Sequence, residues 1–332
     1  MLLKRTVVKE GHKYVTSVLA LASYLAAKSQ GSIRLVTMEP ITSPDGNLLF
    51  AIPKKGRLHE KIVEMLKGAG IHWVRPQRVD IAVSTNMPIT LVFLPAADIA
   101  AYVGEGNVDM GITGQDIIAE TGIEVVQQQP LGFGKCVLAV QAPVDQKITD
   151  IAALAGKRIV TSFPNLARQF FADLEATTSS AATRVKYVSG SVEAACGLGL
   201  ADAVVDLVET GTTMRAAGLE IVAEVMKTQA VLISNPHTKH TTLVNKINKR
   251  ISGYLAAKRY CMLNYNFPRE KLAEALKITP GHRSATVSPL DDESWVAVQA
   301  MVNKSEVSEI MDDLEAGGAV DILVFNIENC RT

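Results

Sequence analysis

The stretch VVDLVETGTTMRAAGL, residues 204–219, decides how the rest of the chain is interpreted. A run of apolar, β-branched residues ends at Asp206, and a short helical segment closed by Gly218 follows it. Between them stand Thr210, Gly211, Thr212 and Thr213. Glycine permits the tight or left-handed backbone that turns successive N–H groups inward, and a helix start leaves its first N–H groups unpaired. The pattern predicts a strand, a phosphate-binding loop with threonine hydroxyls as further donors, and a helix.

The acids of this region suit a different part of a ligand. A carboxylate repels phosphate, but it accepts hydrogen bonds from ribose hydroxyls or holds a divalent cation. With Asp206 before the loop, the stretch reads as a sugar phosphate site. An aspartate-capped helix after a buried strand explains the TGTT fragment equally well, so the assignment depends on the surrounding residues.

A second turn with similar geometry follows the apolar strand expected at LLFAIP, residues 48–53. Lys55, Gly56 and Arg57 stand in the turn before a helix expected at 59–68. Basic side chains at a helix N-terminus oppose the helix dipole, so their presence suggests a bound polyanion that offsets this cost. The alternative is a solvated basic turn.

A third candidate is DMGITG, residues 109–114. It has a glycine on each side of Ile112-Thr113, where the backbone can approach a ligand. Asp116 follows as a candidate cap for a helix at 117–120.

Strand and helix patterns alternate from residue 48 to residue 235, which predicts two α/β lobes with ligands at the carboxyl ends of the strands. Residues 47–136 and 228–258 are assigned to lobe one, and residues 137–227, with a mainly parallel sheet, to lobe two. The segments AEVM and AVLISN return the chain to lobe one. Two crossings then join the lobes around a cleft.

A helical pattern with one apolar face runs from 241 to 260. The elements expected after it are strands at 260–265, 285–290, 295–302 and 319–327 and helices at 269–276 and 305–317. Their order is βαββαβ, which is typical of a ferredoxin-like domain and is assigned to residues 259–332.

Composition describes an ordinary globular chain of two or three domains, with 332 residues, 48% hydrophobic and 20% charged. The 34 basic and 34 acidic residues cancel, so no nucleic-acid partner is expected. No apolar run reaches the roughly 18 residues of a membrane span. The four scattered cysteines form no CxxC pair, which argues against a zinc site and fits reduced thiols in the cytoplasm.

The N-terminal segment differs from the rest. Residues 1–37 contain six basic residues and the single acid Glu10, so a targeting peptide is one interpretation. Polar residues interrupt its apolar part, and it is arginine-poor for a mitochondrial presequence. We expect residues 1–46 to be a peripheral extension, from a start upstream of Met38, with a helix around 14–28 and no part in catalysis.

Nine residues around the threonine loop stand at the spacing of a known signature. They are Glu193, Gly199, Ala201, Val204, Asp206, Thr210, Gly211, Thr213 and Met214. With this spacing the chain resembles ATP phosphoribosyltransferase, the enzyme that opens histidine biosynthesis. The resemblance extends from about residue 48 to residue 331, through PKKGRL, VGEGNVDMGITGQD and a C-terminal domain similar to that of the fungal-like long form.

The resemblance implies a two-lobed fold like that of periplasmic binding proteins, plus a C-terminal ferredoxin-like (βαββαβ) regulatory domain. It implies transfer of phosphoribosyl from phosphoribosyl pyrophosphate to N1 of ATP, with release of pyrophosphate and with Mg²⁺ as cofactor. Charge handling and orientation serve such a step, so no Ser-His-Asp style group is expected. It further implies a homo-oligomer, from dimer to hexamer, and feedback inhibition by histidine.

The resemblance also assigns roles to individual residues. The 5-phosphate would be bound by Thr210, Gly211, Thr212 and Thr213. Asp206 and Glu193 would lie near the ribose hydroxyls or the metal, with Asp206 as the metal ligand. Pyrophosphate or the ATP phosphates would face Lys55, Gly56 and Arg57. Asp109 and Gly114 would line the cleft from lobe one, whereas Glu209 would point at solvent or a neighbouring cation.

Histidine is expected to bind the C-terminal domain. The glycine turn and hydroxyl-rich strand in TPGHRSATVSPL, residues 279–290, place Ser284 and Thr286 where they could face Asn264 or Asn266 of the first strand. Such groups supply the neutral donors and acceptors that an amino acid needs. A plain turn at the sheet edge, followed by ordinary strand threonines, explains any single one of these residues equally well.

One position departs from the family pattern. Many members carry an arginine just before the segment that matches Asp98-Ile99, where this chain has Leu94-Pro95-Ala96. Arg75 or Arg78 is a candidate to replace it.

Two other functions fit part of the pattern. A two-lobed, non-catalytic anion or metabolite sensor would use the same cleft, and another nucleotide phosphoribosyltransferase would differ in the acceptor base. The lysine and arginine turn and the nine-residue signature favour the enzyme.

Overall fold

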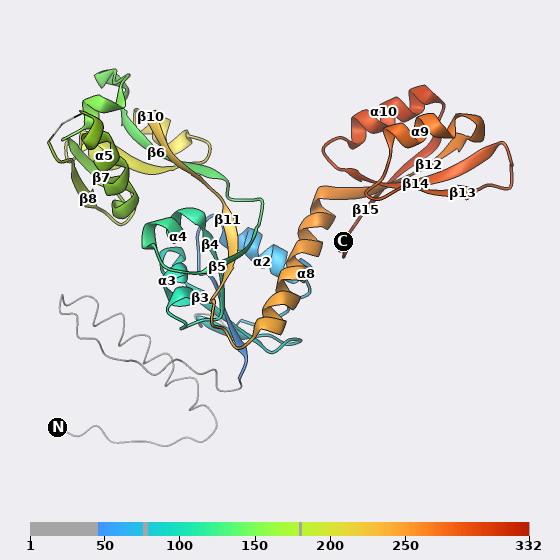
Figure 1. The fold of residues 1–332 in the computed structure, drawn as a ribbon, viewed down its shortest axis with the longest axis horizontal. Helices are drawn as coiled ribbons and strands as arrows, with labels where there is room; N and C mark the ends of the chain where they lie inside the picture. Colours follow the sequence, from blue (N-terminus) through green and yellow to red (C-terminus); the bar gives the residue numbers. More distant parts are fainter. Residues whose placement is uncertain (1–45, 76–78, 179–180, 332) are drawn as a thin grey trace.

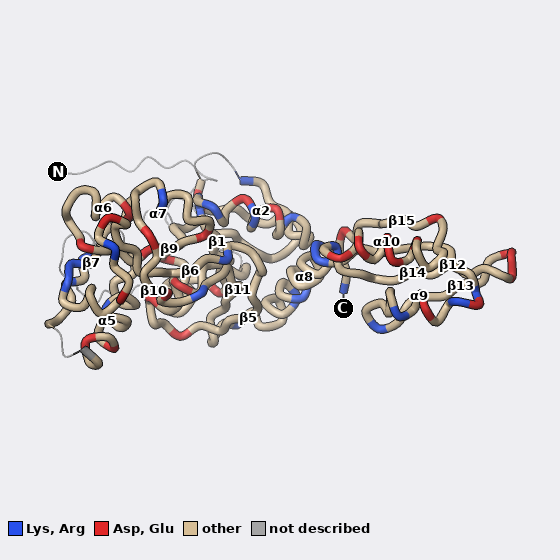
Figure 2. The backbone as a smooth tube through the Cα atoms, turned by 90° about the horizontal axis from the view of Figure 1, so that it is seen from above, with Lys and Arg blue, Asp and Glu red and all other residues tan. Residues whose placement is uncertain are grey.

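Three β-sheets organise the residues that this computed structural model describes, which are 46–75, 79–178 and 181–331. In Figure 1 the first sheet lies in the middle, the second at the upper left and the third at the right. Figure 2 shows the third domain at one end of the molecule, beyond helix α8 (Thr241–Arg259). The expected N-terminal extension, with its helix around 14–28, lies outside the described residues.

The first sheet has six strands in the order β2-β3-β1-β4-β11-β5. β1 runs parallel to β3 and β4, whereas β11 is antiparallel to β4 and β5. All six residues of β1 are buried, as an apolar strand requires at the centre of a sheet covered on both faces. The strands are β1 (Leu48–Pro53), β2 (Ile81–Val83), β3 (Ile89–Leu94), β4 (Met110–Gly114), β5 (Val126–Pro130) and β11 (Ala230–Ser234).

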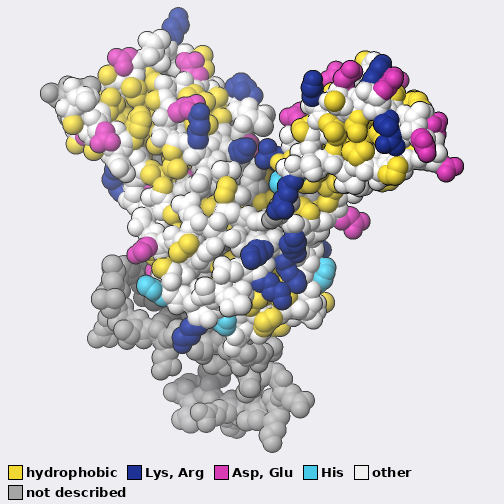
Figure 3. All heavy atoms as spheres, turned by 45° about the vertical axis from the view of Figure 1, so that its right-hand side comes forward, with side chains coloured by type: hydrophobic (Ala, Val, Ile, Leu, Met, Phe, Trp, Pro, Cys, Tyr) yellow, Lys and Arg dark blue, Asp and Glu magenta, His cyan; other side chains and the backbone are white. Residues whose placement is uncertain are grey.

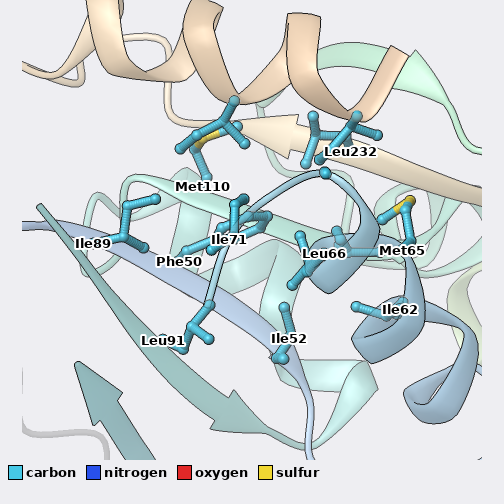
Figure 4. Close-up of a cluster of buried hydrophobic side chains, with 14 of the residues drawn as sticks. Phe50, Ile52, Ile62, Met65, Leu66, Ile71, Ile89, Leu91, Met110 and Leu232 are labelled. Carbon is cyan, nitrogen blue, oxygen red and sulfur yellow. The ribbon is translucent and has the colours of Figure 1, made fainter. Parts of the chain in front are cut away.

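Helices cover both faces of this sheet. On one face α2 (His59–Gly68) and α8 bury a cluster that includes Phe50, Leu66 and Leu232 (Figure 4). On the other face lie α3 (Ile99–Gly104) and α4 (Gln115–Thr121). Because β1 and β4 are parallel, the turns that follow them meet at one edge of the sheet. That edge faces the second lobe.

The second sheet has five strands in the order β10-β6-β9-β7-β8. β7 is parallel to β8 and β9, but β6 is antiparallel to β9 and β10, so the sheet is mixed rather than mainly parallel. Of the two expected return strands, β10 stays in this sheet and only β11 joins lobe one. The elements are β6 (Cys136–Pro143), β7 (Arg158–Thr161), β8 (Arg184–Tyr187), β9 (Ala203–Val208), β10 (Leu219–Thr228), α5 (Pro164–Thr178), α6 (Ala194–Gly197) and α7 (Thr212–Ala216).

The two crossings between the lobes are hydrogen-bonded to each other. Leu131 N donates to Ala230 O at 2.9 Å, and Ala230 N donates to Phe133 O at 3.0 Å. Gly134 has φ +65°, and a Cβ there would come within 2.5 Å of the Leu58 side chain. Two α/β lobes joined by two crossings are therefore present, as expected. The proposed lobe limits, at 136/137 and 227/228, fall within one residue of the start of β6 and the end of β10.

The C-terminal domain has the expected βαββαβ order, with its strands arranged β13-β14-β12-β15. The helices of this domain cover one face of the sheet, where Tyr265 and Phe267 are fully buried. No helix of residues 260–331 covers the other face. Its elements are β12 (Tyr260–Pro268), α9 (Leu272–Ile278), β13 (Thr286–Pro289), β14 (Trp295–Asn303), α10 (Val307–Gly317) and β15 (Val320–Asn326).

This domain is attached to lobe one at two places. α8 continues into β12 at Tyr260, whose φ of −112° and ψ of 159° are those of a strand. The C-terminal tail returns to the end of α2, where Asn329 Nδ2 donates to Gly68 O at 2.9 Å. Within the described ranges, no helix is long and apolar enough to cross a membrane.

Candidate functional site

The threonine loop follows β9 as the sequence predicts. Gly211 has φ +73°, and α7 begins at the next residue. The hydroxyl oxygens of Thr210 and Thr212 lie 3.0 Å apart, and Arg215 Nη2 donates to Thr210 O at 2.9 Å. The side chains of Thr210, Thr212 and Thr213 are exposed, so their hydroxyls are open to a ligand.

Glycine is favoured at position 211, chiefly because of its positive φ. A Cβ there would lie 2.6 Å from Arg215 Nη1, and a positive φ disfavours any other residue. The loop therefore depends on Gly211 for its backbone, while the neighbouring threonines present side-chain donors.

Two carboxylates lie close to the loop. Asp206 is half-buried, and its Oδ1 accepts a hydrogen bond from Leu207 N at 2.8 Å. Burial raises the pKa of Asp206, and the nearby negative charge of Glu193 raises it further. Because two repelling carboxylates are stabilised by a cation, this pair fits a divalent metal ion. No group of three or more potential metal ligands occurs in the part of the chain that is described, so a substrate would have to complete the coordination.

The lysine and arginine turn of lobe one reaches the second lobe. Gly56 has φ +97°, and Lys55 is exposed. Arg57 Nη1 lies 3.0 Å from Glu209 Oε2, and Arg57 Nη2 donates to Cys136 Sγ at 3.0 Å. The cation that Glu209 faces is this arginine, in agreement with the expectation that it points at solvent or a neighbouring cation. Through these contacts of Arg57 with Cys136 and Glu209, the basic turn lies next to the start of the threonine loop.

A cavity of about 200 Å³ opens between the lobes. Lobe one contributes Lys55, Gly56, Arg57 and Gly114 to its lining, and lobe two contributes Phe163 and Leu207. Of the two candidates in DMGITG, Gly114 therefore lies in the cleft.

Asp109 does not lie with these residues, and the expectation that it lines the cleft is wrong. Its Oδ2 accepts a hydrogen bond from Leu49 N at 2.8 Å, and its Oδ1 accepts one from Thr238 Oγ1 at 2.6 Å. These contacts are at the amino ends of β1 and β4. Gly114 is at the opposite edge, roughly 16 Å away for five residues of strand. Asp109 therefore stabilises the sheet.

Asp116 also differs from its expected role. α4 begins one residue before it, so Asp116 is not the residue that precedes the helix. It is buried, and its Oδ1 accepts a hydrogen bond from Thr228 Oγ1 at 2.8 Å. Asp116 thus fixes the start of α4 to the end of β10.

Of the two candidate arginines, Arg78 lies outside the described residues. Arg75 stacks on the Phe93 ring, with 3.6 Å from Cζ to the ring centroid, and lies 3.4 Å from Asp80. Asp80 also pairs with Lys54 at 2.7 Å. Arg75 is therefore next to the basic turn, at the carboxyl edge of the first sheet.

The four candidate residues of the C-terminal domain are partly brought together. Asn264 and Thr286 are both cross-strand partners of Gln299, so these three lie in one row across the sheet. Thr286 does not face the first strand directly, because β14 lies between β13 and β12. Asn266 Nδ2 instead donates to Asp321 at 2.9 Å, and Ser284 lies in the exposed turn before β13.

Two residues could not be predicted from local sequence, because their contacts are with residues distant in the sequence. Gln299 gives no local signal, because its place beside Thr286 and Asn264 depends on strand pairing. Glu120 of α4 accepts hydrogen bonds from Asn165 N and Leu166 N, both at 2.9 Å, and so caps α5 of the other lobe.

Two family models match the chain in succession. The model described as "HisG: ATP phosphoribosyltransferase" matches residues 95–253. The model described as "HisG, C-terminal domain" matches residues 257–329, which contain the βαββαβ unit.

Several fungal proteins are similar to this chain over the whole of their own length. An ATP phosphoribosyltransferase of Yarrowia lipolytica is 54% identical over 295 residues, which are 89% of this chain and 100% of that protein. The ATP phosphoribosyltransferase of Saccharomyces cerevisiae is 51% identical over 89% of this chain and 100% of its own. A chain of the ATP phosphoribosyl transferase (HisG:HisZ) complex from Thermotoga maritima aligns with a TM-score of 0.53 and 28% identity, covering 62% of this chain and 98% of its own.

The contacts of Asp109 lead to a prediction about stability. Replacing Asp109 by Ala leaves the N–H of the buried Leu49 without its acceptor, so we expect the free energy of unfolding to fall by about 1–3 kcal/mol. Urea denaturation measures this change. The control is Asp145→Ala, which removes an exposed carboxylate and should cost less than about 0.5 kcal/mol. Equal stability of both variants would contradict the structural role of Asp109.

Proposed function

The chain belongs to the ATP phosphoribosyltransferase family, and we infer that the cleft between its lobes is where that family's reaction takes place. The enzyme transfers the phosphoribosyl group of phosphoribosyl pyrophosphate to N1 of ATP and releases pyrophosphate. This is the first step of histidine biosynthesis. The main support for placing the reaction in this cleft is the 3.0 Å contact between Arg57 and Glu209, because it supports a common site for the basic turn and the threonine loop.

We propose the following roles for the residues of the cleft. The 5-phosphate is held by Thr210, Gly211, Thr212 and Thr213. The ribose hydroxyls bond to Asp206 and Glu193. The pyrophosphate group, or the phosphates of ATP, faces Lys55, Gly56 and Arg57, and Gly114 lines the cavity beside them.

These roles match the demands of the reaction. As pyrophosphate leaves, positive charge develops at the anomeric carbon and negative charge on the leaving group. Lys55 and Arg57 stabilise that negative charge, and the threonine loop holds the sugar so that N1 of ATP can approach in line. No proton-transfer group is required by this description, which relies on orientation and charge.

Mg²⁺ is the proposed cofactor. Asp206, with Glu193 beside it, would hold the ion. Burial and the negative charge of Glu193 raise the pKa of Asp206, although the Leu207 N–H and Arg57 act in the opposite direction, and a bound cation would relieve the repulsion between the carboxylates. Bound Mg²⁺ neutralises charge on pyrophosphate groups. The four cysteines are free thiols, which supports a reducing compartment, and we propose the cytoplasm.

The threonine loop gives the first test of this site. We expect Thr213→Ala to raise the Michaelis constant for phosphoribosyl pyrophosphate about ten- to a hundredfold, since one hydrogen bond to a charged group contributes about 1.5–3 kcal/mol. Gly211→Val should act similarly through the strained turn. The assay mixes enzyme, Mg²⁺, ATP and phosphoribosyl pyrophosphate and follows adduct formation by ultraviolet absorbance.

The control is Thr242→Ala, which removes an exposed threonine at the start of α8. An unchanged Michaelis constant in Gly211→Val would move the phosphate site elsewhere. Wild-type protein that binds ATP without forming the adduct would support the sensor instead of the enzyme.

A homo-oligomer, from dimer to hexamer, is our proposal for the assembly. β15 is an outer strand of the third sheet, and its side chains Leu323 and Phe325 are half exposed at 50% and 51%. Figure 3 shows hydrophobic side chains gathered on the face of the C-terminal domain in view. An open strand edge with exposed apolar side chains beside it is a surface on which another chain can pack.

Light scattering at micromolar protein tests this proposal. The wild type should scatter as an assembly, and Phe325→Glu should shift it toward the monomer because charge is costly in an apolar contact. Leu198→Glu is the control, since Leu198 is 71% exposed on lobe two. A wild type that is monomeric at every concentration contradicts the proposal.

Inhibition by histidine is proposed to act through the C-terminal domain. Asn264, Gln299 and Thr286 form a row of neutral polar side chains on the face without helices. Such groups can bond to the ammonium and carboxylate of an amino acid. Ser284 and Asn266 flank this row.

The double variant Ser284→Ala and Thr286→Ala tests this site. We expect catalysis without histidine to stay near the wild-type rate, and the histidine concentration for half inhibition to rise about tenfold or more, as for the loss of one or two hydrogen bonds. Ser308→Ala, exposed on α10, is the control. Full sensitivity in the double variant would reject this row, and competition of histidine with ATP in the wild type would reject the regulatory domain as the site.

A further inference from the structure

Arg57 and Glu209 form an ion pair that crosses the cleft. Arg57 follows β1 in lobe one, Glu209 follows β9 in lobe two, and 152 positions separate them in the sequence. Arg57 Nη1 lies 3.0 Å from Glu209 Oε2. The contact therefore joins the two lobes at the point where the proposed phosphate sites meet.

Glu209 occupies a place that a bound anion would need. It directly precedes Thr210 of the threonine loop, and its carboxylate contacts the guanidinium of Arg57. The other contact of that guanidinium is Cys136 Sγ, at 3.0 Å from Nη2. Burial raises the pKa of the Cys136 thiol, so the sulfur remains neutral. The carboxylate that contacts Arg57 directly is thus that of Glu209, and Asp206 is close enough to interact electrostatically with the same arginine.

This ion pair can be displaced. The side chains of Arg57 and Glu209 are 40% and 42% exposed, and water weakens ion pairs of this kind. A guanidinium binds a phosphate group through two parallel hydrogen bonds, and a polyanion carries more charge than one carboxylate. A pyrophosphate group is therefore a stronger ligand for the guanidinium than a single carboxylate.

The lobes stay connected when this pair breaks. Glu120 of α4 caps α5 through Asn165 N and Leu166 N, and Asn165 Nδ2 donates to Glu120 O at 2.9 Å. The paired crossings form a further connection. Neither contact involves Arg57 or Glu209, so release of their ion pair frees the arginine without separating the lobes.

We propose that Glu209 is an internal competitor for Arg57, which an anionic substrate group must displace before the arginine can bind it. The inference rests on the proposed role of Arg57 in binding phosphate groups. Glu209 then determines specificity: pyrophosphate groups displace it, whereas anions of lower charge do so poorly. Its removal should increase affinity, unlike removal of a residue that touches the substrate.

Titration calorimetry with magnesium pyrophosphate, in the absence of nucleotide, tests this proposal. We expect Glu209→Gln to bind pyrophosphate about two- to fivefold more tightly than the wild type, the range set by a half-exposed ion pair. Glu209→Ala should bind at least as tightly as Glu209→Gln. In steady-state assays the Michaelis constant for phosphoribosyl pyrophosphate should fall by a similar factor, with a smaller change in kcat.

The matched control is Glu64→Gln, which removes the same charge from the ion pair of Glu64 with Lys258, at 2.8 Å and remote from the cleft. Pyrophosphate affinity in Glu209→Gln that equals this control, or that is weaker than in the wild type, overturns the proposal. The variant Arg57→Gln distinguishes failure of the proposed function from failure of the competitor role. If it leaves pyrophosphate affinity unchanged, the role of Arg57 in the proposed function fails; if it lowers affinity while Glu209→Gln has no effect, only the competitor role fails.

Discussion

The pairing of the two crossings is the constraint on which the cleft depends. Leu131 and Phe133 are both bonded to Ala230, so the chain enters and leaves lobe two as one short ribbon. A short paired ribbon between two lobes is the kind of connection about which hinge closure occurs in two-lobed proteins. Gly134 ties the basic turn to the same place, because its missing side chain leaves room for Leu58. The ribbon therefore sets the distance between the two turns that form the site.

Each lobe supplies one turn with a glycine in the left-handed region. Gly56 lies in the turn after β1 of the first sheet, and Gly211 lies in the turn after β9 of the second. The first turn supplies the basic side chains of Lys55 and Arg57, and the second supplies the threonine hydroxyls. A lobe that folded alone would thus present only half of the site. Two side chains of lobe one hold the halves of the site together. Arg57 contacts Glu209, and the carboxylate of Glu120 accepts a hydrogen bond from Asn165 N.

Features that depend on neighbours in sequence could be predicted, and features that depend on pairing could not. α2 begins and ends where periodicity placed it, at residues 59 and 68, and the turn at Gly211 follows from its local residues. Asp109 was misassigned because its partners, Leu49 and Thr238, are 60 and 129 positions away. The antiparallel β6 was missed for the same reason, since an apolar strand carries no signal for its direction in the sheet.

The return of the C-terminal tail to lobe one has a mechanical consequence. Asn329 bonds to the carbonyl of Gly68, the last residue of α2, and the first residue of α2 follows the basic turn. A helix of ten residues is a stiff rod about 15 Å long. The C-terminal tail therefore contacts one end of α2 and the basic turn precedes the other, so a single helix connects the C-terminal domain with the cleft.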